Sequence, residues 1–456
     1  MDYDRLHKRI DDMLKYESDN YLVNINLKKE ISDKLYDYQH FHIFNLLTAF
    51  RSHNILLDGS DTGTGKTYTA IAICKQLNLK PLIITPKTII PIWKDVCNYF
   101  KVKPLLIINY ELVKNGKCYY IECINVDNKN NKYIYNWKLP RNSIIIFDEV
   151  HRCKNYKSKN GQLLMSTLKC PKVLMLSATV SDTPKTFNIF GYMLGFYKNL
   201  RRGRNWINGM LREDNNYVGT TVKVSAINKN IYPYRGSRMK IIEIGNKFPK
   251  NQIVAECYYL DKDKQIEVNS SFDQIYMKMN ILKGNKSGIL ADIIKARQKI
   301  ELLKIPIIID LVNQYLENNY SVVIFINFIK TLECLKKEFS NCCIVHGTQT
   351  IDERKKNISL FQENKSNVII CNIKIQEGIS LHDKYGIPRV SIISPSFSSI
   401  DLKQSLGRIH RADSKTPALQ RIVYCANTCE EIICKKVKAK LEFISKLNDD
   451  DLISIY

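Results

Sequence analysis

The sequence has no long hydrophobic run, since none approaches the ~20 apolar residues that a membrane-spanning helix needs. Its start, Met1 to Arg5, is charged, and no apolar segment of the kind found in a secretory leader follows it. These two absences argue against membrane-inserted and secreted proteins. We therefore expect a soluble, intracellular protein without a membrane partner.

The 14 cysteines lack the paired spacing of a tetrahedral zinc site. Their closest groupings are Cys342-Cys343 and the set Cys425, Cys429 and Cys434. Disulfide frameworks are typical of small secreted chains rather than of a chain of 456 residues. We interpret the cysteines as reduced and mostly buried thiols, which indicates a reducing compartment.

Acidic residues are outnumbered, because 45 Asp and Glu stand against 69 Lys and Arg, for a net charge of +24. A charge that far from zero favours polyanionic partners through long-range attraction and counterion release, and nucleic acid is the obvious candidate. A lysine-rich solvated surface from a compositionally biased genome explains the same numbers. Composition alone leaves both explanations open.

Short apolar runs alternate with helix-length segments in both halves of the chain. Runs that are apolar on both faces suit buried parallel strands. The expected strands are residues 54–57, 81–85, 143–147 and 172–176, then 321–328, 342–345, 367–371, 389–394 and 421–425. With helices between them, such as 351–364, both halves are predicted to be α/β domains with parallel sheets.

Between the halves, residues 197–250 are poor in long apolar runs and rich in basic and aromatic residues, such as Arg201, Trp206 and Arg238. Basic residues interleaved with aromatics could follow phosphates and stack on bases. A solvated, irregular connector is the alternative. The predicted domains are a helical extension over 1–34, a first lobe over 35–196, an insertion and linker over 197–250, and a second lobe over 251–456. A loop is predicted at 127–132.

The first expected strand leads into a glycine-rich loop, and a helical pattern follows. This order predicts a phosphate-binding loop for ATP with Mg²⁺. The glycines let backbone N–H groups turn towards the phosphates, the lysine supplies a positive charge, and the last threonine offers a hydroxyl to Mg²⁺. Ser60 stands where the generic pattern has its first glycine. The expected nucleotide-binding residues are Asp61, Thr62, Gly63, Thr64, Gly65, Lys66 and Thr67.

The strand at 143–147 ends in two carboxylates, Asp148 and Glu149. In an open parallel sheet, a side chain at the carboxyl end of a strand faces the ligand crevice. Asp148 is therefore expected to hold Mg²⁺ through water, and Glu149 to orient and deprotonate the attacking water. A lone Asp-Glu pair is commonly a solvent-exposed turn, but the upstream loop favours the catalytic interpretation.

Followed by Val150 and His151, the carboxylate pair resembles the DExH box of the superfamily 2 helicases. Further blocks follow in the order of that family. They are Tyr38-Gln39, Ser177-Ala178-Thr179, residues 376–381 and the Q-x-x-G-R-x-x-R block from Gln404 to Arg411. Each block is short, so the resemblance is carried by their order over nearly the whole chain.

Within the superfamily, the Swi/Snf-like translocase branch is the most similar, through residues 86–95, 109–111 and 148–155. The chain departs from that branch at 375–376, which replace glycines of the fifth motif, and at 412–413 after the sixth. No histone-reading module fits in the remaining length, so nucleosome remodelling is not expected. A compact, Lys/Asn-rich motor of this kind resembles those of large DNA viruses, which would place it in a host cytoplasm or a virion.

The resemblance implies an α/β fold of two tandem RecA-like lobes that hydrolyse ATP at their junction. Gln39 would read the adenine edge, and Arg408 and Arg411 would place guanidinium groups on the γ-phosphate from one helical face. His151 would bond across to the second lobe. The implied coupling residues are His151, Ser177, Thr179 and Gln404, and the implied nucleic-acid contacts are Thr85, Lys87, His346 and Gly378.

The predicted function is an ATP-dependent nucleic-acid helicase or translocase, taken to be a monomer. The Swi/Snf-like blocks favour duplex DNA as the partner, and RNA is the alternative. Two other classes use the same loop: an ATP-dependent nucleic-acid-binding switch or clamp without processive unwinding, and a small-molecule kinase or transporter ATPase. The second lobe with its cationic block argues against the latter.

Overall fold

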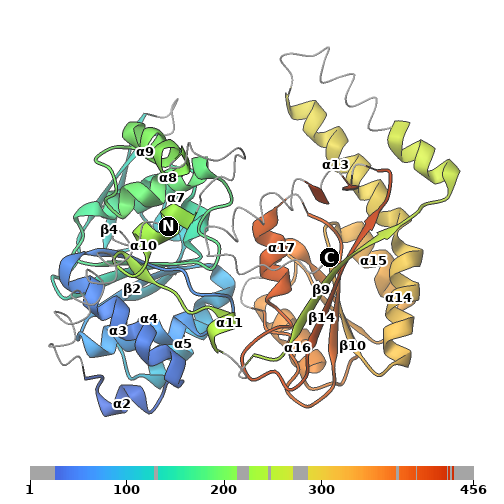
Figure 1. Cartoon of the computed structure of the whole chain (residues 1–456), viewed down its shortest axis with the longest axis horizontal. Helices are drawn as coiled ribbons and strands as arrows, with labels where there is room; N and C mark the ends of the chain where they lie inside the picture. The colour runs from blue at the N-terminus through green and yellow to red at the C-terminus, as the bar shows by residue number, and fades with distance from the viewer. Residues whose placement is uncertain are drawn as a thin grey trace, which may run out of the picture.

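The computed structural model describes residues 26–127, 132–212, 225–244, 248–270, 286–375, 379–396, 398–428, 430–431 and 434–435. Two parallel sheets, one in each half of the chain, form two lobes that stand side by side in Figure 1. The first lobe runs from blue to green and the second from yellow to red.

The first lobe is built on a six-stranded sheet in the order β3-β2-β6-β7-β1-β8, in which every pairing is parallel. Its strands are β1 Ile55–Asp58, β2 Lys80–Thr85, β3 Leu106–Asn109, β6 Ser143–Asp148, β7 Val173–Leu176 and β8 Gly236–Ser237. Every residue of β1, β6 and β7 is buried, as expected for strands covered on both faces.

Helices cover both faces of this sheet, because alternate residues of the buried strands point into two separate apolar clusters. One face carries α2 Lys29–Ser32, α3 Asp37–Ser52, α4 Lys66–Gln76 and α5 Ile90–Tyr99. The other carries α6 Tyr110–Val113, α7 Lys159–Met165, α8 Pro184–Met193, α9 Leu200–Arg212 and α10 Ser225–Ile231. Short 3-10 helices follow β2, β6 and α7, and these are η1 Lys87–Ile89, η2 Val150–Cys153 and η3 Ser166–Lys169.

The second lobe repeats the plan, with a parallel sheet in the order β11-β12-β10-β13-β14-β9. Its strands are β9 Asn251–Tyr258, β10 Ser321–Ile326, β11 Cys342–Val345, β12 Val368–Asn372, β13 Arg389–Ile393 and β14 Ala418–Cys425. One face carries α14 Ile305–Glu317 and α15 Ile329–Glu338, and the other carries α16 Ile351–Gln362 and α17 Ser399–Leu406. The helix α13 Lys286–Leu303 precedes α14, α11 Ile241–Ile244 precedes β9, and η5 Ile373–Ile375 follows β12.

The two parallel α/β sheets confirm the predicted fold class. All nine strands expected from the sequence are present, and each begins and ends within three residues of its predicted bounds. To the two parallel sheets the structure adds β3, β8 and β9, which all lie at sheet edges, and it also has a separate antiparallel pair, β4 Ile121–Asp127 and β5 Lys132–Trp137. β9 mixes exposed with half-buried residues and β8 is only two residues long, so neither has the continuous apolar pattern of a central strand, whereas β3 is a short apolar run that was not predicted.

Residues 197–250 contribute structure to the first lobe as well as connecting the lobes. Within this segment α9 and α10 pack on the first sheet, and β8 pairs with β1. The predicted loop at 127–132 joins the antiparallel pair β4 and β5, and its middle lies outside the described residues. Residues 1–25 of the predicted N-terminal extension also lie outside them.

Every cysteine within the described part of the chain is a free thiol, and among these only Cys257 is exposed. In that same part, no helix combines the length and the apolar character needed to cross a membrane.

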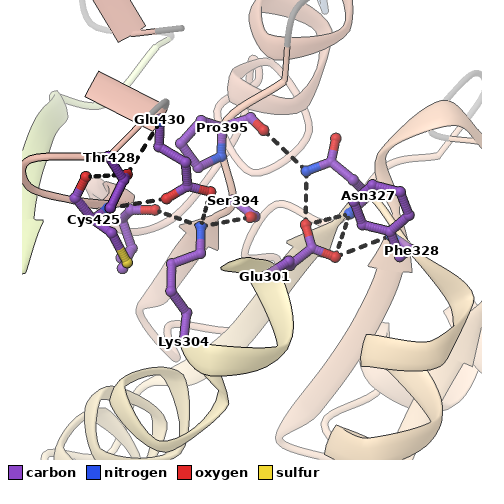
Figure 2. Close-up of polar contacts among 10 residues, drawn as sticks. Glu301, Lys304, Asn327, Phe328, Ser394, Pro395, Cys425, Thr428 and Glu430 are labelled. Atoms are coloured by element: carbon purple, nitrogen blue, oxygen red, sulfur yellow. Dashed lines mark hydrogen bonds and ion pairs between the residues drawn. The ribbon is translucent and has the colours of Figure 1, made fainter. Parts of the chain in front are cut away.

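A buried polar network joins the carboxyl ends of the second lobe's strands to the junction of α13 and α14 (Figure 2). Lys304, at this junction, is fully buried, and its Nζ donates to Ser394 Oγ at 2.9 Å, to the Val423 carbonyl at 3.2 Å and to Glu430 Oε1 at 2.7 Å. Nearby, Glu301 accepts from the backbone N–H of the residues that follow β10. One ion pair and its hydrogen bonds therefore hold together β13, β14 and the segment after β14.

We expect Lys304→Met to lower the free energy of unfolding by about 3–5 kcal/mol, because Glu430 would be left buried without its counter-ion. The double variant Lys304→Met/Glu430→Gln removes both charges and should recover much of that loss. Urea titrations followed by circular dichroism report on this lobe, whereas tryptophan fluorescence does not, since Trp93, Trp137 and Trp206 all precede it. Equal stability of the single and double variants would contradict the role given to the ion pair.

Candidate ATP site between the two lobes

The loop between β1 and α4, residues 59–65, is the expected phosphate-binding loop, and geometry requires two of its glycines. Gly63 and Gly65 have φ of 87° and 92°, in the left-handed region that favours glycine. A Cβ on Gly65 would lie 2.3 Å from Nε2 of Gln39, and a Cβ on Gly63 would lie 3.1 Å from Cγ of Arg411. Since Arg411 belongs to the second lobe, the loop lies at the junction of the lobes.

Carbonyl groups of the same loop hold Lys66. Its Nζ donates to the carbonyls of Ser60 at 2.8 Å and of Asp61 at 3.0 Å. The Thr64 hydroxyl donates to the Asp61 carbonyl at 2.8 Å, and Gln39 Nε2 donates to the Thr64 carbonyl at 3.0 Å. Lys66 and Gln39 therefore both lie on the loop, while the contact of Gln39 with an adenine stays a prediction.

The base of the loop is held by a buried pair that the sequence analysis did not identify. His42 Nε2 lies 3.0 Å from Asp58 Oδ2, and Asp58 Oδ1 accepts from the backbone N–H of Ser60 at 3.0 Å. Burial acts to raise the pKa of Asp58, but His42 outweighs it and the pKa is lowered. The signal that could have found Asp58 is a carboxylate at the end of an otherwise apolar strand, immediately before the loop.

The carboxylate pair ends β6 beside the loop. Burial, and then the neighbouring Glu149, raises the pKa of Asp148 to about 6. For Glu149, burial acts in the same direction, but the hydrogen bond and charge of His151 and the charges of Lys66 and Arg408 bring the pKa down to about 2. Glu149 therefore stays ionised over a wider pH range than Asp148, and it has φ of 51° in the left-handed region.

Asp148 is held by side chains from the end of β2, from α5 and from the start of α6. Its Oδ2 accepts from Thr85 Oγ1 and from Trp93 Nε1, both at 2.8 Å, and its carbonyl accepts from the Tyr110 hydroxyl at 2.7 Å. The prediction that Thr85 contacts nucleic acid is therefore corrected, because its side chain is fully buried and bonded to Asp148. Trp93 and Tyr110 lie in the segments that resemble the Swi/Snf-like branch, and the need of a buried indole or phenol for a hydrogen-bond partner is the signal that could have placed them here.

The expected coupling residues meet around Glu149. His151 Nδ1 lies 3.2 Å from Ser177 Oγ and 3.3 Å from Glu149 Oε2, so its polar contacts are within the first lobe rather than across the junction. Thr179 takes part through its backbone N–H, which donates to Ser177 Oγ at 3.2 Å. Among these residues, Gln404 makes the hydrogen bond across the junction, because its Nε2 donates to Glu149 Oε2 at 3.4 Å.

The two expected arginines follow α17, where Arg408 is buried and Arg411 is half-buried beside Gly63 of the first lobe. Nη1 of Arg408 and Nη2 of Arg411 both donate to the Ile379 carbonyl, at 3.1 and 2.9 Å. A Cβ on Gly407 would lie 2.8 Å from the Thr62 side chain, so this backbone runs against the phosphate-binding loop. Burial, followed by the charge of Arg408, lowers the pKa of Arg411 to about 9, which leaves its guanidinium mostly protonated at neutral pH.

A tyrosine pair forms a second polar contact between the lobes. The Tyr36 hydroxyl donates to Asp413, and its ring stacks on Tyr38 with centroids 5.6 Å apart. The hydrogen bond to Asp413, with burial, raises the pKa of Tyr36 to about 12. Asp413 is one of the positions where the sequence departs from the Swi/Snf-like branch, and the structure gives this departure a partner in the first lobe.

The remaining expected nucleic-acid contacts are less closely grouped. Lys87 is exposed in η1 after β2, and His346 is half-buried after β11, where its Nδ1 lies 2.9 Å from Thr348 Oγ1. Gly378 lies outside the described residues.

A hollow of about 430 Å³ lies between the lobes next to the carboxylate pair. The first lobe lines it with basic side chains, and the second lobe with the start of α17. The lining includes Lys114, His151, Arg152, Lys154, Lys159, Ser398 and Asp401.

Two family models match the chain, one on each lobe. The model described as "Type III restriction enzyme, res subunit" matches residues 32–182, and the model described as "Helicase conserved C-terminal domain" matches residues 303–413. An Acanthamoeba polyphaga mimivirus protein named as an ATP-dependent RNA helicase is 38% identical over 460 residues, which cover 93% of this chain and 86% of the relative. The chain is a superfamily 2 helicase.

Other similarities of the helicase are local or distant. A pre-mRNA-splicing ATP-dependent RNA helicase of Debaryomyces hansenii is 34% identical over 80 residues, covering 16% of this chain and 13% of the relative. An uncharacterized ATP-dependent helicase of Mycoplasma genitalium is 27% identical over 151 residues, covering 32% of this chain and 14% of the relative. The solved structure of the Sulfolobus solfataricus SWI2/SNF2 ATPase core in complex with dsDNA is similar over 93% of this chain and 97% of that chain. The sequence identity is 15% and the TM-score is 0.36.

As a member of this family, the helicase binds and hydrolyses ATP and acts on nucleic acid.

Proposed function

We propose that this helicase is a nucleic-acid-stimulated ATPase that moves along its polymer, with ATP held between residues 59–67 and the arginines after α17. The observation that carries the proposal is the shared lining of the hollow between the lobes. The elements that line it, η2 and α17, also carry His151 and Gln404, which contact Glu149. A polymer bound there would touch both lobes through elements that hold the catalytic carboxylate.

The chemistry of hydrolysis follows from the charges at the junction. Lys66 and the backbone N–H groups at the start of α4 bind the phosphates, and Glu149 accepts a hydrogen bond from the attacking water and then its proton. Phosphoryl transfer spreads negative charge over the γ-phosphate oxygens, which Arg408 and Arg411 stabilise from the second lobe. Because these groups come from both lobes, hydrolysis requires the lobes to be together.

The site suits Mg²⁺, which Thr67 and Asp148 would hold. Mg²⁺ prefers oxygen ligands and retains several waters. Within the described residues, hydrogen bonds engage only Oδ2 of the Asp148 carboxylate, and the half-buried Thr67 lies in the first turn of α4. When bound, the ion would neutralise charge on the phosphates.

Duplex DNA is the polymer favoured by the Swi/Snf-like blocks, and RNA is the alternative given by the name of the mimivirus relative. Basic side chains at the hollow would contact phosphates, so binding should be largely independent of sequence and should weaken with salt. Lys87 and His346 lie at the carboxyl ends of β2 and β11 and are proposed as further contacts.

Steady-state ATPase assays test the proposal. We expect wild type to be stimulated by one of single-stranded DNA, duplex DNA, single-stranded RNA or duplex RNA, and the stimulation to fall as salt rises. The stimulated rate of Lys66→Ala should be about 10²–10³-fold lower than that of wild type, because the variant lacks the positive charge that contacts the phosphates. The same basal rate with every polymer would contradict the proposal.

A switch or clamp that binds polymer with ATP but does not move shares this site. Displacement assays separate the two functions. A motor that moves on duplex DNA removes a triplex-forming strand or a bound streptavidin while it hydrolyses ATP, whereas a clamp hydrolyses ATP and displaces neither.

A further inference from the structure

The segment that connects the lobes runs directly beside the phosphate-binding loop. β8 pairs with β1, and the pairing continues past the end of both strands as alternating backbone hydrogen bonds. These bonds run from Leu57 N–H to the Arg235 carbonyl at 3.0 Å, from Gly59 N–H to the Ser237 carbonyl at 3.1 Å and from Asp61 N–H to the Met239 carbonyl at 3.0 Å. Residues 235–239 therefore form an edge strand for the loop itself.

A buried ion pair fastens this edge. Arg238 Nη2 lies 2.7 Å from Asp61 Oδ1, and Arg238 Nε donates to the Gly59 carbonyl at 3.2 Å. The other carboxylate oxygen of Asp61 accepts from the backbone N–H of Ile241 at 3.0 Å. The two charged side chains are only 3% and 8% exposed, so the pair is almost free of competition from water.

The anchored residue is the one that holds the phosphate-binding lysine. Through its carbonyl, Asp61 accepts from Lys66 Nζ and from the Thr64 hydroxyl, while its side chain is held by Arg238. A rotation of the Asp61 peptide would therefore move the acceptor of Lys66. The position of Lys66 thus depends on a residue of the connecting segment.

Further along, the same segment contacts the second lobe's arginine block. The Pro249 carbonyl accepts from His410 Nε2 at 2.8 Å, and the Phe248 ring lies edge-on to His410 with centroids 5.4 Å apart. His410 stands between Arg408 and Arg411 in the chain. In the view of Figure 1, α11 of this segment lies at the side of the first lobe nearest the second.

We propose that Arg238 is a positioning residue of the ATP site: it holds Asp61, and through Asp61 the loop that binds the phosphates, so ATP affinity depends on the connecting segment. The inference rests on the proposed role of Lys66 in binding the phosphates. It extends the set of residues that determine ATP binding beyond the motifs seen in the sequence.

The first test compares ATP binding and hydrolysis by wild type, Arg238→Ala and Lys66→Ala. In Arg238→Ala, KM for ATP and the Kd of a fluorescent ATP analogue should rise about tenfold. A change of this size in affinity is what the loss of one charge-assisted hydrogen bond produces. kcat at saturating ATP should change much less, because Glu149 and the arginines stay in place. Arg235→Ala is the matched control, since its side chain contacts His53 Nδ1 at 2.7 Å instead of the loop.

A second comparison separates positioning from stability alone. Arg238→Ala leaves Asp61 buried without its partner, so the thermal midpoint should fall. Arg238→Met/Asp61→Asn removes both charges and should recover the midpoint while KM for ATP stays raised, because the loop is still released from the segment. If KM returned to the wild-type value together with the midpoint, the role of Arg238 would be structural only and the proposal overturned.

The outcomes also distinguish this inference from the proposed function. Unchanged KM in Arg238→Ala, with ATP binding lost in Lys66→Ala, would overturn the inference and leave the proposed site intact. Wild-type ATP binding by Lys66→Ala would instead contradict the proposed site. If Arg238→Ala failed to fold, Arg238→Lys, which keeps the charge but loses the Nε donor to Gly59, should show a smaller rise in KM; no rise would overturn the inference.

Discussion

Glu149→Gln is expected to lower kcat for ATP hydrolysis by about 10²–10⁴-fold and to leave ATP affinity nearly unchanged. The glutamine keeps the size of the side chain and an oxygen that can accept from Gln404, but it cannot take a proton from water. The low pKa of Glu149, about 2, leaves its carboxylate ionised, and its contacts with His151 and Gln404 fix the orientation of that charge.

Single-turnover hydrolysis and equilibrium binding of an ATP analogue measure the two effects separately. Glu122→Gln is the matched control, because this glutamate lies on β4 with a half-exposed side chain and pairs with Lys138 outside the site. If Glu149→Gln hydrolysed ATP at the wild-type rate, the general base would have to be another group. A large loss of affinity with unchanged kcat would assign Glu149 to binding instead.

Arg411→Ala is expected to reduce the polymer-stimulated kcat by about 10³-fold or more, the effect associated with removing a guanidinium from the γ-phosphate. Arg411 lies against Gly63 of the phosphate-binding loop, and the pKa of its guanidinium, about 9, keeps it mostly charged at neutral pH. Arg411→Lys should recover only part of the loss, because an ammonium group lacks the planar fork of donors.

Steady-state kinetics with saturating polymer provide the measurement, and polymer binding in the absence of ATP shows whether the fold is intact. Arg421→Ala is the matched control, since this arginine of β14 pairs with Glu256 and Tyr315 away from the junction. A wild-type rate in Arg411→Ala would remove the second lobe from the chemistry, and Arg408 would then be tested in the same way.

Local patterns were sufficient to predict the central strands and the phosphate-binding loop. A buried parallel strand must be apolar on both faces, and a loop that turns N–H groups towards phosphates needs glycines at defined places, so both leave a signature in consecutive residues. Gly63 and Gly65 have the positive φ that their residue type allows. Of the edge strands, β9 mixes exposed with half-buried residues and β8 has only two residues, so neither left such a signature, while the short apolar run of β3 was missed.

The sequence by itself therefore determined the α/β class, the two lobes and the residues at the ends of the central strands. The tertiary structure alone decided which of these residues meet. Thr85 was expected to contact nucleic acid, but folding buries it against Asp148; His151 was expected to cross the junction, but Gln404 makes that hydrogen bond. Arg238 lies 177 residues from Asp61 in the chain. A contact of this kind depends on how sheets and connections pack in space, and the spacing of residues along the chain carries no record of it.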